Sequence, residues 1–211
     1  MRELYQVADE AAEKIIKKIH RQFQHNRLAH FDEMNLPQTR KHIKKLYDKV
    51  EKIVFQEFTE TLPILEDEYY DIALDMGYDG DFEDLDESFI EEFFEEYNPV
   101  TKYVFKNELG RKESRLFESL IADAKDKVHS YKTAEFLLKR QVRQYAVDLE
   151  DEVAKTVYKA LGVQKVQWIS EHDEKTCDVC QEMDGEVYDL SDVPPKQHYN
   201  CRCYLIPVRV K

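Results

Sequence analysis

Five side chains that can bind a metal ion lie close together near the end of the sequence. Cys177 and Cys180 form a C-x-x-C pair, and His198, Cys201 and Cys203 form an H-x-x-C-x-C group. These groups contain every cysteine of the chain. The C-x-x-C spacing lets two thiolates reach one ion from a tight turn, and structural zinc prefers four tetrahedral nitrogen and sulfur ligands. The spacing therefore predicts a structural zinc site.

Five candidate donors are one more than zinc needs, so two ligand sets stay open. The preferred set is Cys177, Cys180, His198 and Cys201, and the competing set has Cys203 in place of His198. In a strand, residues two apart point to the same side, so Cys201 and Cys203 could both reach the ion. A module of roughly 45 residues buries little core, so the metal would supply much of its folding energy.

The same residues have three alternative interpretations, namely two disulfides, inert buried thiols or a catalytic site. The N-terminal stretch "MRELYQVADEAAEKIIKKIH" mixes charged and apolar residues and lacks the apolar run of a signal peptide. We therefore expect a cytosolic protein, in which paired cysteines bind metal more often than they form disulfides. Catalysis would need a nucleophile assisted by His198, or an open metal with a base such as Glu182 or Asp173. Acidic residues are abundant throughout and no nucleophile motif is present, so we expect no enzymatic activity.

The composition favours a helical protein that is acidic overall. The chain of 211 residues has 36% charged residues, only 5 glycines and 6 prolines, and a formal net charge of -13. Scarce turn formers favour helices over a sandwich of short strands. The net charge argues against a surface that binds nucleic acid or anionic membrane everywhere. No apolar run approaches the ~18 residues needed to span a bilayer, so no membrane partner is expected.

Apolar residues at helical spacing predict a series of amphipathic helices up to Gly162, a natural residue to end a helix. Pro37 stands near the start of the second helix, and Pro63 is expected to separate two helices. The stretch "MGYDGDFEDLDES" is expected to be a loop. The predicted helices span residues 1–27, 35–58, 65–76, 87–98, 113–128 and 133–161.

Beyond Gly162 the pattern changes to short strands. "VQKVQWIS", "DGEVYDL" and "CYLIPVRV" are predicted as strands, and "CDVC" as a turn. Helices followed by strands, segregated along the chain, indicate a mainly α protein. We predict an elongated helical body over residues 1–162 and a small C-terminal α+β module with the Cys/His residues over residues 163–211.

The order of motifs in this module resembles a known family. A "WIS" strand is followed by the acidic turn "EHDEKTCDVC", an "EMDG" step, a Val-Tyr strand, "PPKQH" and "NCRC". This order is similar to the C-terminal module of the phage minor head proteins, the Mu F-like head-morphogenesis family. Tyr199 stands where the family often has proline, and the specific resemblance covers roughly the last 45 residues. The matching positions are Cys177, Cys180, Asp184, Gly185, Pro195, His198, Asn200, Cys201, Arg202 and Cys203.

The resemblance implies a minor capsid protein that acts in head assembly near the portal, in few copies. Its implied partners are the portal protein and other capsid or scaffold proteins. It would be synthesised in the bacterial host cytoplasm and reside in the virion head. The competing hypotheses are a metal-dependent nuclease or hydrolase, which a chelator would inactivate, and a zinc-stapled nucleic-acid-binding adaptor, whose DNA binding would be sensitive to salt.

Charge is unevenly distributed along the chain. Residues 66–96 contain fifteen acidic residues and no lysine or arginine. Part of this stretch resembles the calcium-binding loop of an EF-hand. Gly77 stands at a ligand position without offering a ligand side chain, and Asp86 stands where a bidentate glutamate is expected, so we reject a calcium site. We expect a solvated acidic face, which could also present a docking surface to a basic partner. The first two helices could contact packaged DNA, although a polar face balanced internally by this acidic stretch is the favoured interpretation. The basic residues concerned are Lys14, Lys17, Lys18, Arg21, Arg27, Arg40, Lys41, Lys44, Lys45, Lys49 and Lys52.

Overall fold

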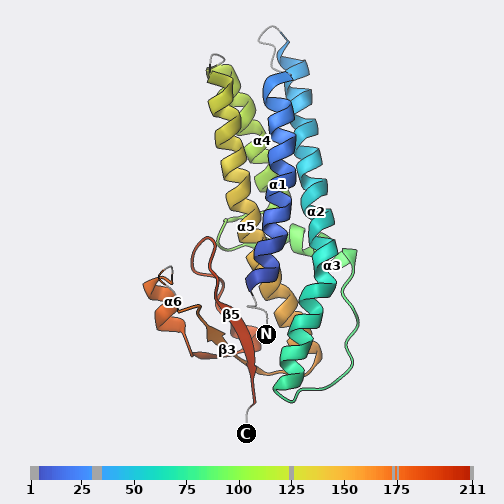
Figure 1. The fold of residues 1–211 in the computed structure, drawn as a ribbon, viewed down its shortest axis with the longest axis vertical. Coiled ribbons are helices and arrows are strands. Elements are labelled where there is room, and N and C mark those ends of the chain that lie inside the picture. Colours follow the sequence, from blue (N-terminus) through green and yellow to red (C-terminus); the bar gives the residue numbers. More distant parts are fainter. Residues whose placement is uncertain (1–4, 30–34, 124–125, 173, 175, 210–211) are drawn as a thin grey trace.

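Four long helices form the elongated body of the protein. The computed structural model describes residues 5–29, 35–123, 126–172, 174 and 176–209. Helices α1 (Tyr5–Ala29), α2 (Leu36–Asp75), α4 (Phe105–Ala122) and α5 (Lys127–Ala160) lie side by side in a bundle (Figure 1). Helix α5 contacts each of the other three. The mainly α fold is therefore confirmed, and the first residues of the predicted helix over 1–27 lie outside the described part.

Helix α2 runs through Pro63 without a break, so the predicted separation into two helices is wrong. Asn35 caps the helix by accepting a hydrogen bond from the Gln38 backbone N–H. Proline removes one backbone hydrogen bond from a helix interior. Here Phe58 before the proline and Tyr69 after it are both fully buried in the same core. The continuous apolar stripe holds the two halves in line and outweighs the lost bond.

The segment that joins α2 to α4 contains a short helix and a small hairpin. Helix α3 (Glu87–Glu95) is capped by Asp86, which accepts from the Ser88 backbone N–H. The helix predicted to reach residue 98 ends earlier because β1 (Tyr97–Asn98) pairs with β2 (Tyr103–Val104). The stretch from residue 78 to 86 has no helix or strand, as predicted.

Helices α4 and α5 both begin earlier than their apolar patterns predict, by eight and six residues. The end of α5 is predicted correctly. Gly162 has φ +76° and its N–H donates to the Lys159 carbonyl, while the Val163 N–H donates to the Tyr158 carbonyl at 2.9 Å. This is the left-handed helix ending that glycine allows. None of the described helices combines the length and hydrophobicity needed to cross a bilayer.

A three-stranded antiparallel sheet follows. Strand β3 (Lys165–Ile169) lies between β4 (Val187–Asp189) and β5 (Tyr204–Val208), with Trp168 opposite Leu205 in the β3–β5 register. All three predicted strands are confirmed, although β4 is short. The predicted turn at "CDVC" is instead part of helix α6 (Asp178–Met183).

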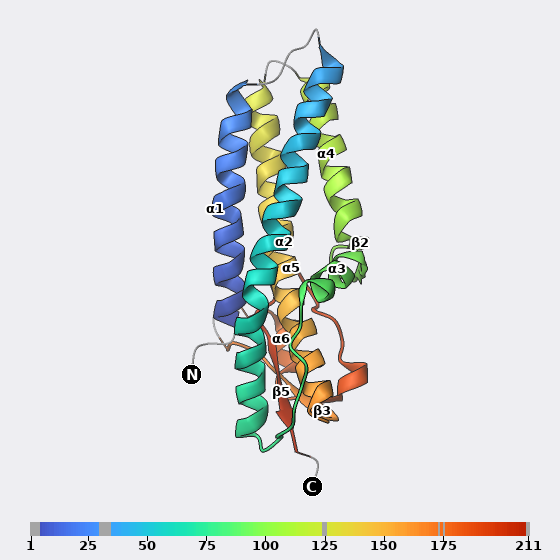
Figure 2. The same cartoon turned by 90° about the vertical axis from the view of Figure 1, so that its right-hand side faces the viewer.

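The sheet packs against the lower half of α5 and α2 (Figures 1 and 2). Trp168 and Leu205 are fully buried in one core cluster with Tyr158 of α5. The Tyr158 hydroxyl donates to the Leu205 carbonyl at 3.0 Å, and the Tyr78 hydroxyl donates to the Val208 carbonyl at 2.9 Å. The helical body and the sheet thus share a continuous core, and the division at residue 162 stays a prediction.

Candidate metal centre

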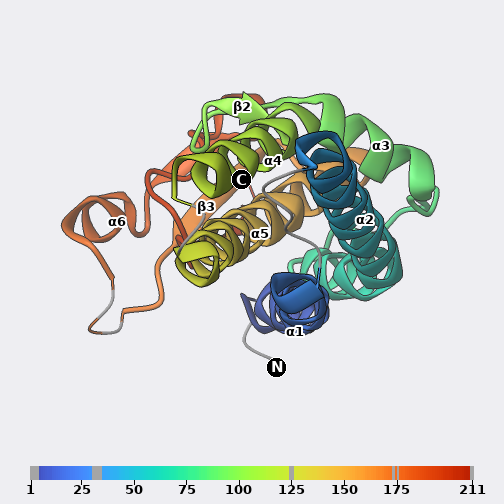
Figure 3. The same ribbon diagram turned by 90° about the horizontal axis from the view of Figure 1, so that it is seen from above.

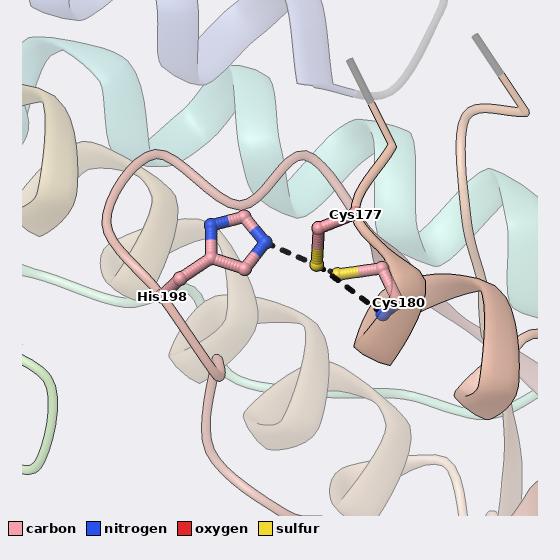
Figure 4. Close-up of side chains that lie close together, drawn as sticks. All are labelled: Cys177, Cys180 and His198. Carbon is pink, nitrogen blue, oxygen red and sulfur yellow. Dashed lines mark hydrogen bonds between the residues drawn. The ribbon is translucent and has the colours of Figure 1, made fainter. Parts of the chain in front are cut away.

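The predicted metal ligands come from two segments that meet beside the sheet. Cys177 is the N-terminal capping residue of α6, and its Sγ accepts from the Cys180 backbone N–H at 3.4 Å. The first turn of α6 therefore places Cys180 beside Cys177 (Figure 4). His198, Cys201 and Cys203 come from the loop that leads into β5.

Cys180 is the residue on which the other donors converge. Its Sγ lies 3.2 Å from His198 Nε2 and 3.5 Å from Cys201 Sγ. The donor atoms form two triads, Cys177–Cys180–His198 and Cys180–Cys201–Cys203, with all atoms of a triad within 4.8 Å of one another. The donors of a tetrahedral zinc site with Zn–S near 2.3 Å and Zn–N near 2.0 Å are about 3.5–3.8 Å apart. The observed separations are close to that geometry, with Cys180 common to both triads.

The loop reaches this position without forming a strand at Cys201 and Cys203. Both residues precede β5, so the expectation that strand alternation aligns them is wrong, although both are buried. Asn200 adopts a left-handed conformation with φ +59°, and its backbone N–H donates to Gln144 Oε1 of α5 at 2.9 Å. This turn, anchored on α5, directs the two cysteines inward.

The hydrogen bond of His198 indicates which ring nitrogen carries a proton. Its Nδ1 lies 3.0 Å from the Tyr199 carbonyl oxygen, which can only accept a hydrogen bond. Nδ1 therefore carries the proton, and the Nε2 lone pair faces Cys180. This is the tautomer in which imidazole binds metal, oriented by a backbone carbonyl.

The four thiols are all free of disulfides and have unequal acidity. Burial raises the pKa of Cys180 to about 12. The hydrogen bond with Cys203 lowers the pKa of Cys201 to about 5, and the positive charge of Lys196 acts in the same direction. The centre thus favours one thiolate at Cys201, and a metal bound by further thiols would displace their protons.

Of the two acids considered as a catalytic base, Glu182 is exposed on α6 and Asp173 lies outside the described residues.

Residues 110–206 match the family described as phage Mu protein F like protein. Over these residues, which are fewer than half of the chain, the sequence is similar to that family, and we call them the Mu F-like region. The Mu F-like region begins within α4, contains α5, β3, β4 and all five candidate donors, and ends within β5, so it is larger than the C-terminal stretch that the motifs alone indicated. The match supports a phage head morphogenesis protein. No curated protein and no solved structure matches the chain.

Residues 193–203, which lead into β5 and are called the metal-site loop, are held on α5 by a buried lysine. Lys196 is 4% exposed, its Nζ lies 2.9 Å from Asp151 Oδ1, and it also donates to the Cys203 carbonyl oxygen. The ammonium group stands 5.1 Å from the centre of the Trp168 ring. Burial opposes the charge, but Asp151 and the other nearby negative groups outweigh it and raise the pKa of Lys196. The sequence gives no sign of this role, because a lysine in "PPKQH" looks like a solvated loop residue.

Beside this ion pair lies a carboxyl group that is held protonated. Glu150 of α5 is 3% exposed and accepts a hydrogen bond from the Tyr69 hydroxyl at 3.0 Å. Burial raises the pKa of Glu150 from 4.5 to about 8, although the charge of Lys196 acts against this. The folded protein therefore binds a proton here at neutral pH, and the unfolded chain does not.

Glu150→Gln is expected to make the free energy of unfolding less dependent on pH. A carboxyl whose pKa is raised on folding contributes stability below its unfolded pKa, and this is lost as pH rises towards the folded pKa. Between pH 5.5 and 7.5, the free energy of unfolding of the wild type should fall by about 2 kcal/mol more than that of Glu150→Gln. Urea denaturation at several pH values measures this, with the exposed Glu182→Gln as the control. Parallel pH curves for wild type and Glu150→Gln would contradict the prediction.

Several basic residues of α1 and α2 already have partners. Lys18 pairs with Glu57 and Lys44 with Asp48, while the Arg40 guanidinium lies 5.1 Å from the Phe117 ring centre. Both acids belong to α2 and precede residue 66, so these lysines are balanced by acids near them and not by the acidic stretch 66–96 as expected. DNA contact through these helices stays a prediction, and the side chain of Arg27 lies outside the described residues.

Proposed function

We propose that this protein is a minor capsid protein that acts in phage head assembly near the portal, without enzymatic activity. We also propose that one structural zinc ion cross-links its C-terminal module. The observation that carries the proposal is the convergence of four other Cys/His donors on Cys180 within the Mu F-like region. The proposed partners are the portal protein and other capsid or scaffold proteins, and the proposed locations are the bacterial cytoplasm during synthesis and the virion head afterwards. DNA is a further proposed partner through the basic residues of α1 and α2.

The residues present suit a structural zinc ion. Thiolate sulfur and imidazole nitrogen are the donors that zinc prefers, and closed sites of four such donors are structural. Zinc would bind Cys180, the other two residues of one triad and one residue of the other triad. This arrangement is compatible with both ligand sets that the sequence predicts. When bound, zinc would cross-link α6 to the loop before β5. Because Cys180, Cys201 and Cys203 are buried, the site leaves little access for a substrate.

The proposed location is tested by mass spectrometry of particles made in a host that carries the gene. We expect the protein in purified heads, in fewer copies than the major capsid protein, and a fall in the yield of filled heads when the gene is deleted. A variant with the codons of Lys41 and Lys45 changed synonymously is the matched control. Heads that never contain the protein, or normal yield after deletion, would contradict the proposal.

A further inference from the structure

The outer side of α4 carries a groove with positive charge, which is unusual in so acidic a protein. The groove runs along α4 from Lys106 to Glu118 and is bounded by Tyr103 of β2 and Tyr199 of the metal-site loop. Arg111 and Arg115 line it, and Arg140 of α5 lies against the Tyr199 ring. We call these five residues the arginine groove.

The three arginines of the groove form no ion pair with any described residue. The other two cations of the lining differ, since Lys106 pairs with Glu95 and Lys112 with Glu108. In a chain with a net charge of -13, carboxylates are plentiful, so a group of unpaired arginines indicates a surface that receives its carboxylates from outside.

Two of these guanidinium groups are held ready for an anion. Arg111 lies 4.0 Å from the centre of the Tyr103 ring and Arg140 lies 3.9 Å from the centre of the Tyr199 ring. Stacking on an aromatic face fixes the plane of the guanidinium and leaves its N–H edges to donate to carboxylates in pairs. The groove is therefore preorganised for a row of carboxylate groups.

The same chain carries such a row in the segment between α2 and α3. We call residues 79–87, with the sequence DGDFEDLDE, the acidic segment; it has six acidic residues and no basic ones. Tyr70 of α2 holds the segment in place, because its hydroxyl donates to the Gly80 carbonyl at 3.1 Å and its ring stacks on Phe82. Asp81, Glu83 and Asp84 are exposed and pair with no described residue.

The groove and the segment lie on different sides of the molecule. Seen from above, α4 lies on one side of α3 and the α2–α3 connection runs along the opposite, right-hand edge (Figure 3). Since Tyr70 and Phe82 fix the segment against α2, the segment projects away from the groove of its own copy. The two surfaces can therefore meet between molecules.

We propose that the arginine groove of one copy binds the acidic segment of a second copy. The contact joins unlike surfaces, so each copy offers one of each and successive copies assemble head to tail, closing a ring or extending a filament. The chosen occupant is the second copy because the pairing uses charges that this chain itself segregates. A nucleic acid, in contrast, would be repelled by the net negative charge of the whole protein.

Sedimentation velocity at low and high salt tests the proposal. At about 0.05 M salt we expect concentration-dependent assembly, and at about 0.5 M salt a monomer, because the shorter Debye length screens the contact. Reversing the groove with Arg111→Glu and Arg115→Glu, or the segment with Asp81→Lys, Glu83→Lys and Asp84→Lys, should each weaken self-association about tenfold or more. Neither variant should assemble alone, because its own groove and segment carry like charge. A mixture of the two should assemble, because the reversed groove attracts the reversed segment and the two unchanged surfaces attract each other as in the wild type.

The controls separate this contact from changes in net charge or folding. Lys41→Glu with Lys45→Glu adds the same charge on α2, outside the groove, and should assemble like the wild type, whereas circular dichroism should show all variants folded. A wild type that stays monomeric at low salt overturns the proposal, as does a mixture that fails to assemble. Binding of a short DNA duplex that Arg111→Glu with Arg115→Glu abolishes, without self-association of the wild type, would assign the groove to nucleic acid instead.

Discussion

Protein purified without chelator is expected to contain one zinc ion per chain, and Cys180→Ser is expected to lose it. Cys180 belongs to both donor triads, whereas every other candidate belongs to only one. A serine hydroxyl is a poor replacement for a thiolate, so this change leaves neither triad intact. Elemental analysis of the wild type and the variant measures the metal, and thiol titration should find the four thiols reactive only after denaturation with chelator.

Loss of the metal should unfold the metal-site loop while the long helices stay folded. Apparent zinc affinities of small structural sites correspond to about 10–16 kcal/mol, which is large beside the core of so small a module. Trp168 and Leu205 are nevertheless buried against α5, so the sheet has packing of its own. We therefore expect new protease cleavage between α6 and β5, with little change in helical circular dichroism. Glu182→Ser, an exposed change on the same helix, is the matched control.

Single replacements of His198 and Cys203 decide between the two ligand sets. If the ligands are Cys177, Cys180, His198 and Cys201, Cys203→Ser keeps the metal and His198→Gln loses it. The opposite pattern indicates four thiolates. Metal-free wild type with four freely reactive thiols would contradict the zinc proposal, and so would Cys180→Ser protein with a full complement of zinc.

The parts of this structure that could be predicted are those fixed by local sequence. Periodic apolar residues define α1 and α5 because each helix buries a single stripe, and Gly162 ends α5 because few other residues tolerate its φ of +76°. The clustering of the five Cys/His side chains could be predicted because a C-x-x-C pair followed by an H-x-x-C-x-C group has the residue types and spacing of a zinc site. Their role as zinc ligands stays a prediction.

The parts that could not be predicted depend on contacts between distant segments. Helix α2 continues past Pro63 because both of its halves bury side chains in one core. The residues of "CDVC" form the start of α6, where the Cys177 sulfur caps the backbone of Cys180. The loop residue Lys196 is buried because Asp151, forty-five positions earlier, lies opposite it in α5. Such effects arise only when the tertiary structure places the partners together.

Lys196→Met is expected to be strongly destabilising, at about 3–5 kcal/mol, because it removes one member of a buried ion pair. Asp151 would keep its negative charge in a buried site next to Glu150, with no cation to compensate it. The cation–aromatic contact with Trp168 and the hydrogen bond to the Cys203 carbonyl would also be lost. The exposed pair Lys165–Asp189, at 2.8 Å, supplies the matched control, and Lys165→Met should cost less than about 1 kcal/mol.

A double replacement shows whether the cost comes from the uncompensated charge. Lys196→Met with Asp151→Leu removes both charges, and well-packed apolar residues often replace a buried ion pair at little cost. We expect the double variant to recover most of the stability lost by Lys196→Met, except the share due to the Cys203 carbonyl, which loses its donor in both. Urea denaturation of all four members of the cycle, with zinc content measured in each, gives the coupling energy. If Lys196→Met costs no more than Lys165→Met, the ion pair does not hold the metal-site loop on α5, and the packing of Trp168 and Leu205 must hold it instead.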